Sequence, residues 1–327
     1  MTEMMTALFG GAGPDWETRQ VPVPKPGPGQ VLVRARAVSL NNADVQMLAA
    51  ADPASGSRQE YLAGFEFAGE IAALGEGAGG VRLGERVMGT TQGAFAQYVL
   101  ADHRHVIAVP AGIADEDASA LPTGLLTEHG ALTLGDFQPG QSVLITGATS
   151  SIGLIGIQIA KSLGAGTVIA TTRTESKKDL LTDAGADCVI ATASQDLTGL
   201  VLDATDGQGA DLVLDHVGGQ TFADCLPATR VDGRIVNIGR LDQAESTINL
   251  DALSYRHLRI AGVSFGFSRP DELGHVIAAL AHQVLPAVAD GRIRPVIDSV
   301  LPFGQAKEAA NRMRSGRAHG KIILTVP

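Results

Sequence analysis

The chain has 327 residues, of which 45% are hydrophobic and 18% charged, a balance that allows a large buried core and two domains of ordinary size. Its formal net charge of -10 argues against nucleic acid or an anionic membrane as the main partner. Two cysteines exclude a disulfide framework and a four-cysteine zinc site, and no apolar run is long enough to span a bilayer. Together with a polar N-terminus, these features predict a cytoplasmic globular protein.

Residues 1 to about 115 are predicted to be rich in β-strands and turns. The runs MTALFGG and GQVLVRARAVSL favour strands, and the proline-rich stretch PVPKPGPGQ between them excludes a helix. The segment GEIAALGEGAGGVRLGERVMG continues with short strands and glycine turns. From about residue 117 the spacing of apolar residues becomes helical, up to a turn at Pro139–Gly140.

After this turn, strand-like and helix-like runs alternate to about residue 265. SVLITG, TVIATT, ADLVLDHVG and GRIVNIG are typical of strands, and SIGLIGIQIAKSLG and TFADCLPATRVD are typical of helices. Such alternation predicts a doubly wound, mostly parallel α/β sheet. The remaining residues indicate one amphipathic helix, a strand, a short helix and a final strand. We therefore predict a nucleotide-binding domain, residues 118–265, between two parts of a catalytic domain, residues 1–117 and 266–327.

The segment GATSSIG is predicted to bind the pyrophosphate of a dinucleotide. It joins a strand to a helix, so unpaired N–H groups and the positive end of the helix dipole would face the ligand. Gly147 would make the sharp turn, and Gly153 would let the helix pack closely. Ser150 replaces the middle glycine of the usual pattern, and its hydroxyl can bind phosphate, cap the helix, or do both. The predicted contacts are Gly147, Thr149, Ser150, Ser151, Ile152 and Gly153.

The end of the second strand of this domain decides between NADH and NADPH. NAD sites usually carry an acidic residue there, about 20 residues after the loop, to bind the ribose hydroxyls. This chain instead has Thr172 and Arg173, followed by Lys177. Hydroxyls and cations suit a 2′-phosphate, to which they donate charge-assisted hydrogen bonds. We predict NADPH as the cofactor, the alternative being that these cations are only solvated surface charges.

The chain resembles the medium-chain dehydrogenase/reductase superfamily almost from end to end. The resemblance is carried by GPGQVLVRARAVSLNNAD, GFEFAGEIAALGEG, LLTEHGAL, VLITGATSSIGLIGIQIAKSLGA, GADLVLDHVGG, GRIVNIG and GRAHGKIIL. It implies a GroES-like β-rich catalytic domain and a Rossmann domain with a doubly wound parallel sheet, in a protein that is often a homodimer.

Zinc-dependent members of this superfamily have Cys and His ligands where this chain has Asn41 and Phe65. Glu66 is retained, but one carboxylate is not a zinc site. The chain therefore resembles the zinc-free branch, which includes NADPH:quinone oxidoreductases and related enone and enoyl reductases. This resemblance implies no metal. It also implies hydride transfer from NADPH to a quinone or an α,β-unsaturated carbonyl, with hydrogen bonds stabilising the charge that develops on oxygen.

The same resemblance implies the residues that carry the reaction. Asn41 would donate to the substrate or the cofactor, or only cap a turn. Tyr61 would donate a proton or form only the pocket wall, and Thr127 would contact the nicotinamide ribose or amide. His129 stands where the family often has Tyr, and we predict that it is packed or at the surface. Asp44 is predicted to organise the loop around Asn41.

Further cofactor contacts are predicted at Val217, Gly239, Phe265 and Lys321. Val217 and Gly239 end strands, and the carboxyl edge of a doubly wound sheet is where ligands bind. Phe265 and Lys321 follow from the resemblance, and for Lys321 the alternative is a cation at a strand edge.

Two other interpretations of the whole chain stay open. One is a biosynthetic enoyl or ketone reductase that acts on a polyketide-like intermediate. The other is a non-catalytic NADPH-binding sensor, for which the acidic composition argues against RNA as a partner.

Overall fold

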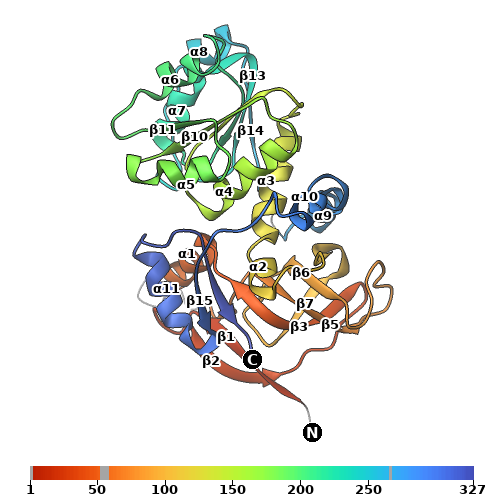
Figure 1. The fold of residues 1–327 in the computed structure, drawn as a ribbon. Coiled ribbons are helices and arrows are strands. Elements are labelled where there is room, and N and C mark those ends of the chain that lie inside the picture. The colour runs from red at the N-terminus through yellow and green to blue at the C-terminus, as the bar shows by residue number, and fades with distance from the viewer. Residues whose placement is uncertain (1–2, 52–58, 265–266) are drawn as a thin grey trace. The chain divides into compact units, whose positions relative to one another are not determined.

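The computed structural model describes residues 3–51, 59–264 and 267–327 of the chain (Figure 1). The chain divides into two compact units. The first comprises residues 1–123, 266–281 and 294–327, and the second comprises residues 124–265 and 282–293. The predicted domain boundaries, after residues 117 and 265, stay predictions.

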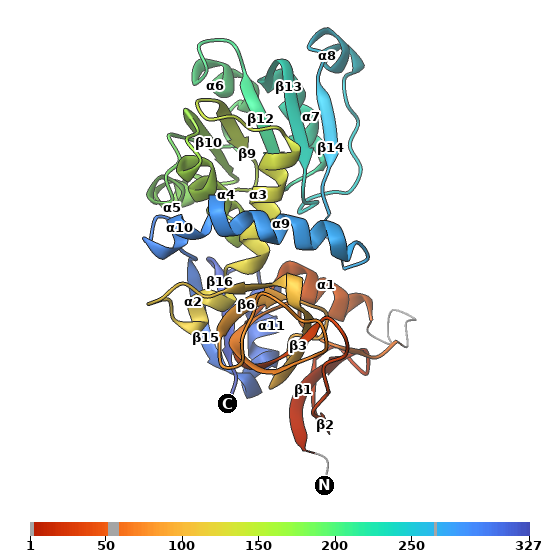
Figure 2. The ribbon, with the colours of Figure 1, turned by 90° about the vertical axis from the view of Figure 1, so that its right-hand side faces the viewer.

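The first unit is organised around a sheet of seven strands, several of which are labelled in Figure 2. Six of them follow the order β15-β16-β3-β5-β6-β8, and β7 pairs with β3. Because the final strand β16 pairs antiparallel with β3, Ile323 lies opposite Ser39 although the two are far apart in sequence. The strands are β3 (Gln30–Ser39), β5 (Glu66–Leu74), β6 (Arg86–Thr90), β7 (Tyr98–Asp102), β8 (Val106–Ala108), β15 (Ile297–Pro302) and β16 (Lys321–Thr325).

A second sheet of this unit has the strand order β2-β1-β4. Its strands are β1 (Met4–Gly10), β2 (Glu17–Pro22) and β4 (Tyr61–Leu62). The helices are α1 (Asn42–Ala50), α2 (Asp115–Ser119), α9 (Pro270–Gln283) and α11 (Ala306–Arg314), with 3-10 turns η2 (His103–His105) and η4 (Phe303–Gln305). The last residues of α9 belong to the second unit.

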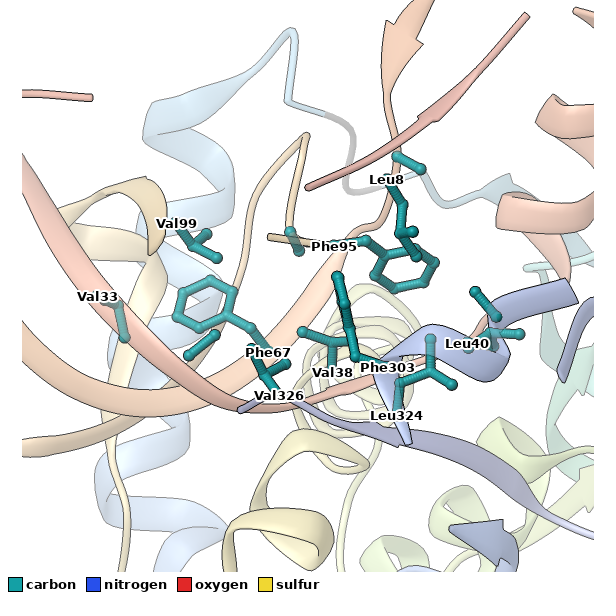
Figure 3. Packing of buried hydrophobic residues seen from close by; sticks show 14 of the residues in the cluster. Leu8, Val33, Val38, Leu40, Phe67, Phe95, Val99, Phe303, Leu324 and Val326 are labelled. Carbon is teal, nitrogen blue, oxygen red and sulfur yellow. The ribbon is translucent and has the colours of Figure 1, made fainter. Parts of the chain in front are cut away.

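The core of the first unit is apolar and contains aromatic rings (Figure 3). Phe67, Phe95 and Phe303 lie in one cluster with aliphatic side chains of β1, β3 and β16. Trp16 meets the Phe95 ring edge-on, with 5.3 Å between the ring centroids. Full burial of one such side chain stabilises the fold by about 1.5–3 kcal/mol. This cluster therefore holds β3 and the polar residues at its end in a fixed place.

The second unit has one sheet of six parallel strands in the order β11-β10-β9-β12-β13-β14. The strands are β9 (Ser142–Ile145), β10 (Thr167–Thr172), β11 (Cys188–Ala191), β12 (Ala210–Asp215), β13 (Thr229–Asn237) and β14 (Arg259–Gly262). Strand order reverses between β9 and β12, as in doubly wound sheets that bind dinucleotides at this point. The central strands are almost entirely buried, because helices cover both faces.

The helices of this unit follow the predicted alternation with strands. They are α3 (Pro122–Leu134), α4 (Ser151–Ser162), α5 (Lys178–Asp183), α6 (Leu197–Asp203), α7 (Gly219–Ala228), α8 (Leu250–Tyr255) and α10 (Leu285–Ala289), with a 3-10 turn η3 (Glu175–Lys177). The first two residues of α3 belong to the first unit. In the described part of the chain, no helix is both long enough and apolar enough to cross a membrane.

Two details differ from the sequence prediction. The single amphipathic helix expected after residue 270 is two helices, α9 and α10, separated at Val284. Pro286 explains the break, because a proline lacks the N–H and its ring clashes with the carbonyl four residues earlier. The helix expected to include residues 229–232 ends before them, since β13 begins at Thr229. The α/β class, with a β-rich part and a doubly wound parallel sheet, is confirmed.

Candidate active site

The predicted phosphate loop lies between β9 and α4 in the second unit. Gly147 has a φ of +57°, a conformation that favours glycine. A Cβ on Gly153 would lie 2.7 Å from the Ala148 Cα, so only glycine permits this approach of helix and loop. The Ser150 hydroxyl accepts a hydrogen bond of 3.0 Å from the Gly153 N–H and caps α4. Thr149, Ser150, Ser151 and Ile152 all remain partly exposed.

Three predicted cofactor contacts meet at the carboxyl edge of the parallel sheet. A Cβ on Gly147 would lie 3.0 Å from Val217 Cγ2, and one on Gly239 would lie 2.6 Å from the His216 carbonyl oxygen. Asp215 fixes this edge, because its carboxylate accepts from Thr146 Oγ1 at 2.7 Å and from the Gly218 N–H at 3.1 Å. The structure thus brings Gly147, Val217 and Gly239 together around one turn.

The residues predicted to bind the 2′-phosphate differ in their exposure. Thr172 is buried, and its hydroxyl donates to the Thr174 carbonyl at 3.2 Å. Arg173 is exposed and Lys177 is partly exposed. Neither of these cationic side chains forms a hydrogen bond or ion pair with another described residue, whereas Lys178 pairs with Glu175 at 3.4 Å. Arg173 and Lys177 are therefore the side chains of this set with free charge to offer an anion.

The first unit contains a buried polar cluster formed by Ser39, Asn41, Glu66 and Lys321. Glu66 Oε2 accepts hydrogen bonds from Lys321 Nζ at 2.6 Å, Ser39 Oγ at 2.8 Å and Asn41 Nδ2 at 3.0 Å. Its other oxygen accepts from the Thr123 N–H at 2.8 Å. Lys321 Nζ also donates to Asn41 Oδ1 at 2.7 Å. These hydrogen bonds compensate the cost of burying the Glu66 carboxylate and the Lys321 ammonium.

Lys321 is the first residue of β16, and its side chain is 2% exposed. Its contact with the cofactor stays a prediction. The pairing of β16 with β3 explains the burial, because it brings the start of β16 to the end of β3. Asn41 does precede helix α1, as a capping residue would, but its side chain contacts Glu66 and Lys321.

Asp44 and Tyr61 add two ionisable groups near this cluster. Asp44 Oδ2 accepts a 2.7 Å hydrogen bond from the Asn41 N–H, which agrees with its predicted organising role. Its Oδ1 is buried without a hydrogen-bond partner among the described residues. Burial raises the pKa of Asp44 to about 7. The Tyr61 hydroxyl is likewise buried, next to the Trp16 indole, and burial raises its pKa.

The remaining predicted residues are Thr127, His129 and Phe265. Thr127 is partly exposed on α3. His129 is buried on the same helix, in contact with Gln283, and burial lowers its pKa, so it is packed as predicted. Phe265 lies outside the described residues. Within those residues, no group of three or more His, Cys, Asp or Glu side chains could hold a metal ion.

Two residues of interest were absent from the sequence prediction. Glu128 and His216 are both buried in the second unit, with Glu128 Oε1 3.0 Å from His216 Nε2. The signal was a glutamate within the apolar run LLTEHGALTL, since glutamate is almost never fully buried without a partner. Its partner could not be identified, because the contact joins a helix to a distant strand end.

Two protein-family models match the chain. The alcohol dehydrogenase GroES-like domain matches residues 27–111, and the zinc-binding dehydrogenase model matches residues 151–282. These matches correspond to the β-rich part and to most of the parallel-sheet part of the chain.

Solved structures resemble the chain over nearly its whole length. A mycobacterial quinone oxidoreductase is 26% identical with a TM-score of 0.87, over 98% of this chain and 99% of the other. A mycobacterial protein in complex with NADPH is 27% identical with a TM-score of 0.84, over 98% and 99% of the two chains. A 2-haloacrylate reductase is 28% identical with a TM-score of 0.83, over 98% and 99%.

Similar curated proteins are much longer than this chain. A mycocerosic acid synthase-like polyketide synthase from Mycobacterium tuberculosis is 32% identical over 307 residues, which are 92% of this chain and 14% of the synthase. An erythronolide synthase from Saccharopolyspora erythraea is 31% identical over 91% of this chain and 8% of its own length. The chain therefore spans a small part of the curated relatives it matches.

A GroES-like domain and a Rossmann-type parallel sheet together define the class to which the chain belongs. The chain belongs to the medium-chain dehydrogenase/reductase superfamily and is similar within it to the NADPH:quinone oxidoreductases. The family and the fold class predicted from the sequence are confirmed.

Proposed function

We propose that the protein is a zinc-independent, NADPH-dependent reductase of quinones or α,β-unsaturated carbonyls. The observation that carries this proposal is the buried polar cluster, in which Lys321 is held by Asn41 and Glu66. The resemblance to zinc-dependent members aligns Asn41 with a cysteine ligand. A cation bound by Asn41 and Glu66 would have to displace an ammonium that already contacts both side chains.

The cluster offers chemistry in place of a metal. A buried ammonium and an amide are hydrogen-bond donors held in position before the reaction, and such donors stabilise negative charge that develops on a carbonyl oxygen. Their effect is larger in a low-dielectric interior than in water. We propose that Asn41 and Lys321 set the positive potential at the acceptor oxygen, with Glu66 as the positioning residue that holds both.

The cofactor proposal rests on the second unit. Gly147, Val217 and Gly239 lie at the carboxyl edge of the parallel sheet, where dinucleotides bind, and the N-terminal N–H groups of α4 suit a pyrophosphate. Arg173 and Lys177 have free charge for a 2′-phosphate, which supports NADPH over NADH. We propose that Thr149, Ser150, Ser151, Ile152 and Gly153 complete the phosphate contacts, and that Thr127 contacts the nicotinamide side.

Bound NADPH would supply a hydride, which adds to the β-carbon of the conjugated acceptor or to the quinone. The two electrons move onto the acceptor oxygen, and one proton must then reach that oxygen or the α-carbon. Asp44, with a pKa of about 7, and the buried Tyr61 hydroxyl are two groups of the first unit that can hold such a proton. We propose Tyr61 as the donor and Asp44 as the group that sets its environment.

The deciding experiment is the oxidation of NADPH by chelator-treated protein. The acceptors are a 1,4-quinone, a cyclic enone and a 2-alkenal, and NADH is compared with NADPH. We expect turnover of at least one acceptor that is unchanged by the chelator. NADPH should be preferred by about tenfold, the equivalent of one charge-assisted hydrogen bond. Loss of turnover on metal removal, or a preference for NADH, would contradict the proposal.

A second candidate is a biosynthetic reductase of a polyketide-like enoyl or ketone intermediate. It is favoured by one observation, the match of 92% of this chain to part of a polyketide synthase. A 2-enoyl thioester of N-acetylcysteamine tests it: turnover with this thioester, and none with quinone or enone, would replace the first proposal. Tight NADPH binding without turnover of any acceptor would indicate a sensor instead.

Two properties of the whole protein belong to the same proposal. We expect a homodimer, because β14 is an edge strand of the parallel sheet with exposed residues along it. We also expect a small-molecule substrate in the cytoplasm, with neither nucleic acid nor a membrane as a partner.

A further inference from the structure

Glu128 and His216 form a buried pair of ionisable side chains that the proposed reaction does not use. Glu128 is fully buried on α3, and His216 is 4% exposed directly after β12. Glu128 Oε1 lies 3.0 Å from His216 Nε2. Neither carboxylate oxygen, nor that ring nitrogen, forms a well-directed hydrogen bond with any described residue. The pair therefore depends on the attraction between its two members.

The pair joins three elements around the predicted phosphate loop. A Cβ on Gly156 of α4 would lie 2.3 Å from Glu128 Oε2, so the carboxylate occupies the space that a side chain would need. The His216 N–H donates to Thr146 Oγ1 at 3.0 Å, and its Cβ lies 3.4 Å from the Cβ position of Gly147. The contact thus ties α3 to α4 and to the first residue of the loop.

Each member of the pair also neighbours a predicted cofactor contact. Glu128 follows Thr127 on α3, and His216 precedes Val217 at the end of β12. A change in the separation of the pair would therefore move Thr127 and Val217 relative to one another.

The surrounding charges favour a protonated imidazole. Burial alone would lower the pKa of His216, but the negative charges of Glu128 on α3 and Asp215 on β12 outweigh it and raise the pKa. From α4 and the loop, Gly156 and Gly147 contribute no charge. The segment after β13 binds His216 through the Leu241 N–H, 3.1 Å from the His216 carbonyl, and carries Arg240 and Asp242 on either side of that residue.

We propose that Glu128 and His216 are a positioning pair that holds the phosphate loop, Thr127 and Val217 in the NADPH-binding arrangement only while His216 is protonated. The inference rests on the proposed function, because it assigns a role to the predicted NADPH site. Loss of the proton leaves Glu128 as an uncompensated buried charge, which favours separation of α3 from the β12 turn. NADPH affinity then falls as pH rises.

The test is the Kd for NADPH, measured by fluorescence titration from about pH 7 to about pH 9.5, above the titration of the 2′-phosphate. The informative variant is the double change Glu128→Leu and His216→Leu, because replacing both members of a buried pair by apolar residues preserves folding better than replacing one. The matched control is His257→Gln, which removes an exposed histidine 3.7 Å from Asp232 in the same unit.

For the wild type and His257→Gln, we expect the Kd to rise by roughly fivefold or more over this range, a typical size for coupling between two sites. The double variant should bind NADPH with a Kd that does not follow pH. Glu128→Gln should abolish the rise, because loss of the imidazolium proton then leaves no uncompensated buried charge. An equal rise in the wild type and the double variant would overturn the inference, and so would a flat wild-type profile. A wild type that binds no NADPH at any pH would instead refute the proposed function, and the inference with it.

Discussion

A buried lysine ammonium is stable only where a negative charge compensates it, and Lys321 meets this condition through Glu66. The carboxylate is itself held by Ser39, Asn41 and the Thr123 N–H. Removal of either charge leaves the other in an apolar interior, so the pair is expected to contribute to both folding and catalysis.

Lys321→Met should therefore lower the free energy of unfolding by about 3–5 kcal/mol, the usual cost of leaving one buried charge unpaired. Combining it with Glu66→Leu should cost less than the sum of the two single changes, because no charge then stays buried. Urea denaturation measures both effects. As a control, Lys307→Met breaks an exposed ion pair of 2.7 Å with Asp15 and should change the stability little. A Lys321→Met variant as stable as this control would contradict the buried ionic contact.

Asp44 makes the stability of the protein depend on pH in a defined direction. Its pKa is about 7 in the folded chain because of burial, against about 3.9 for an unfolded aspartate. Between these values the folded state binds more protons than the unfolded state, so stability falls as pH rises from about 4 to about 7. Asp44→Asn should remove this loss, which amounts to at most about 4 kcal/mol.

The measurement for Asp44 is the free energy of unfolding at several pH values between about 4 and 7, for the wild type and Asp44→Asn. The exposed Asp203→Asn on α6 serves as the control. If the wild type and Asp44→Asn change in parallel with pH, the carboxyl of Asp44 is not the group that titrates.

At the scale of single elements, the start of α4 has a structural role beside its proposed role in ligand binding. The Ser150 hydroxyl accepts the Gly153 N–H, which satisfies one of the N–H groups that a helix leaves free. The proton of the same hydroxyl stays available for a phosphate oxygen. Capping of α4 and contact with a phosphate are therefore compatible roles for Ser150. Protein stability measures the first role, and the Kd for NADPH measures the second.

Ser150→Ala should lower the free energy of unfolding by about 1 kcal/mol through loss of the cap. Ser151→Ala, one residue further, should have a smaller effect because Ser151 makes no capping bond in the described structure. Thermal unfolding compares the two variants without cofactor. Equal stability of both variants would show that the cap contributes nothing, and a raised Kd for NADPH in Ser150→Ala alone would indicate a phosphate contact.

The order of elements could be predicted from the sequence because alternating strand and helix patterns are local. The same holds for the turn at Gly147, the cap at Ser150 and the close packing at Gly153, which follow from the strand, loop and helix on either side of them. Their contacts with a cofactor stay predictions. The residues around Lys321 could be named only through the resemblance, and their contacts could not be derived. Asn41 and Lys321 are 280 positions apart, and only the pairing of β16 with β3 brings them together.

The contact between Glu128 and His216 likewise could not be derived from the sequence, although both residues lie in one domain. An isolated glutamate in an apolar helix indicates a buried partner, but the sequence does not say which of the 25 cationic residues or eight histidines it is. The packing of α3 against the end of β12 decides this, and packing depends on the whole sheet. The break between α9 and α10 is a different case, because Pro286 signals it in the sequence itself.

At the scale of the whole molecule, β14 is an edge strand of the parallel sheet, and we expect it to pair with a second chain. Strand β14 has three exposed residues out of four, and an open strand edge is a template for pairing with another chain. A second copy related by a two-fold axis would satisfy the edges of both chains.

Light scattering should accordingly give a mass of about twice 33.7 kDa for the protein in solution. Ile260→Lys, which adds a charge to β14, should shift the equilibrium towards the monomer. Val189→Lys, on β11 at the opposite edge of the sheet, should leave the dimer intact. A wild-type mass of one chain, or equal effects of the two lysines, would argue against dimerisation through β14.

The missing side chain at Gly156 constrains how the sequence can change over evolutionary time. Alanine at 156 would force the Glu128 carboxylate out of the space it occupies beside His216. A lineage that keeps the Glu128–His216 pair is therefore expected to keep this glycine, and one that loses the acid can replace it. A single contact thus links the substitutions at these two positions.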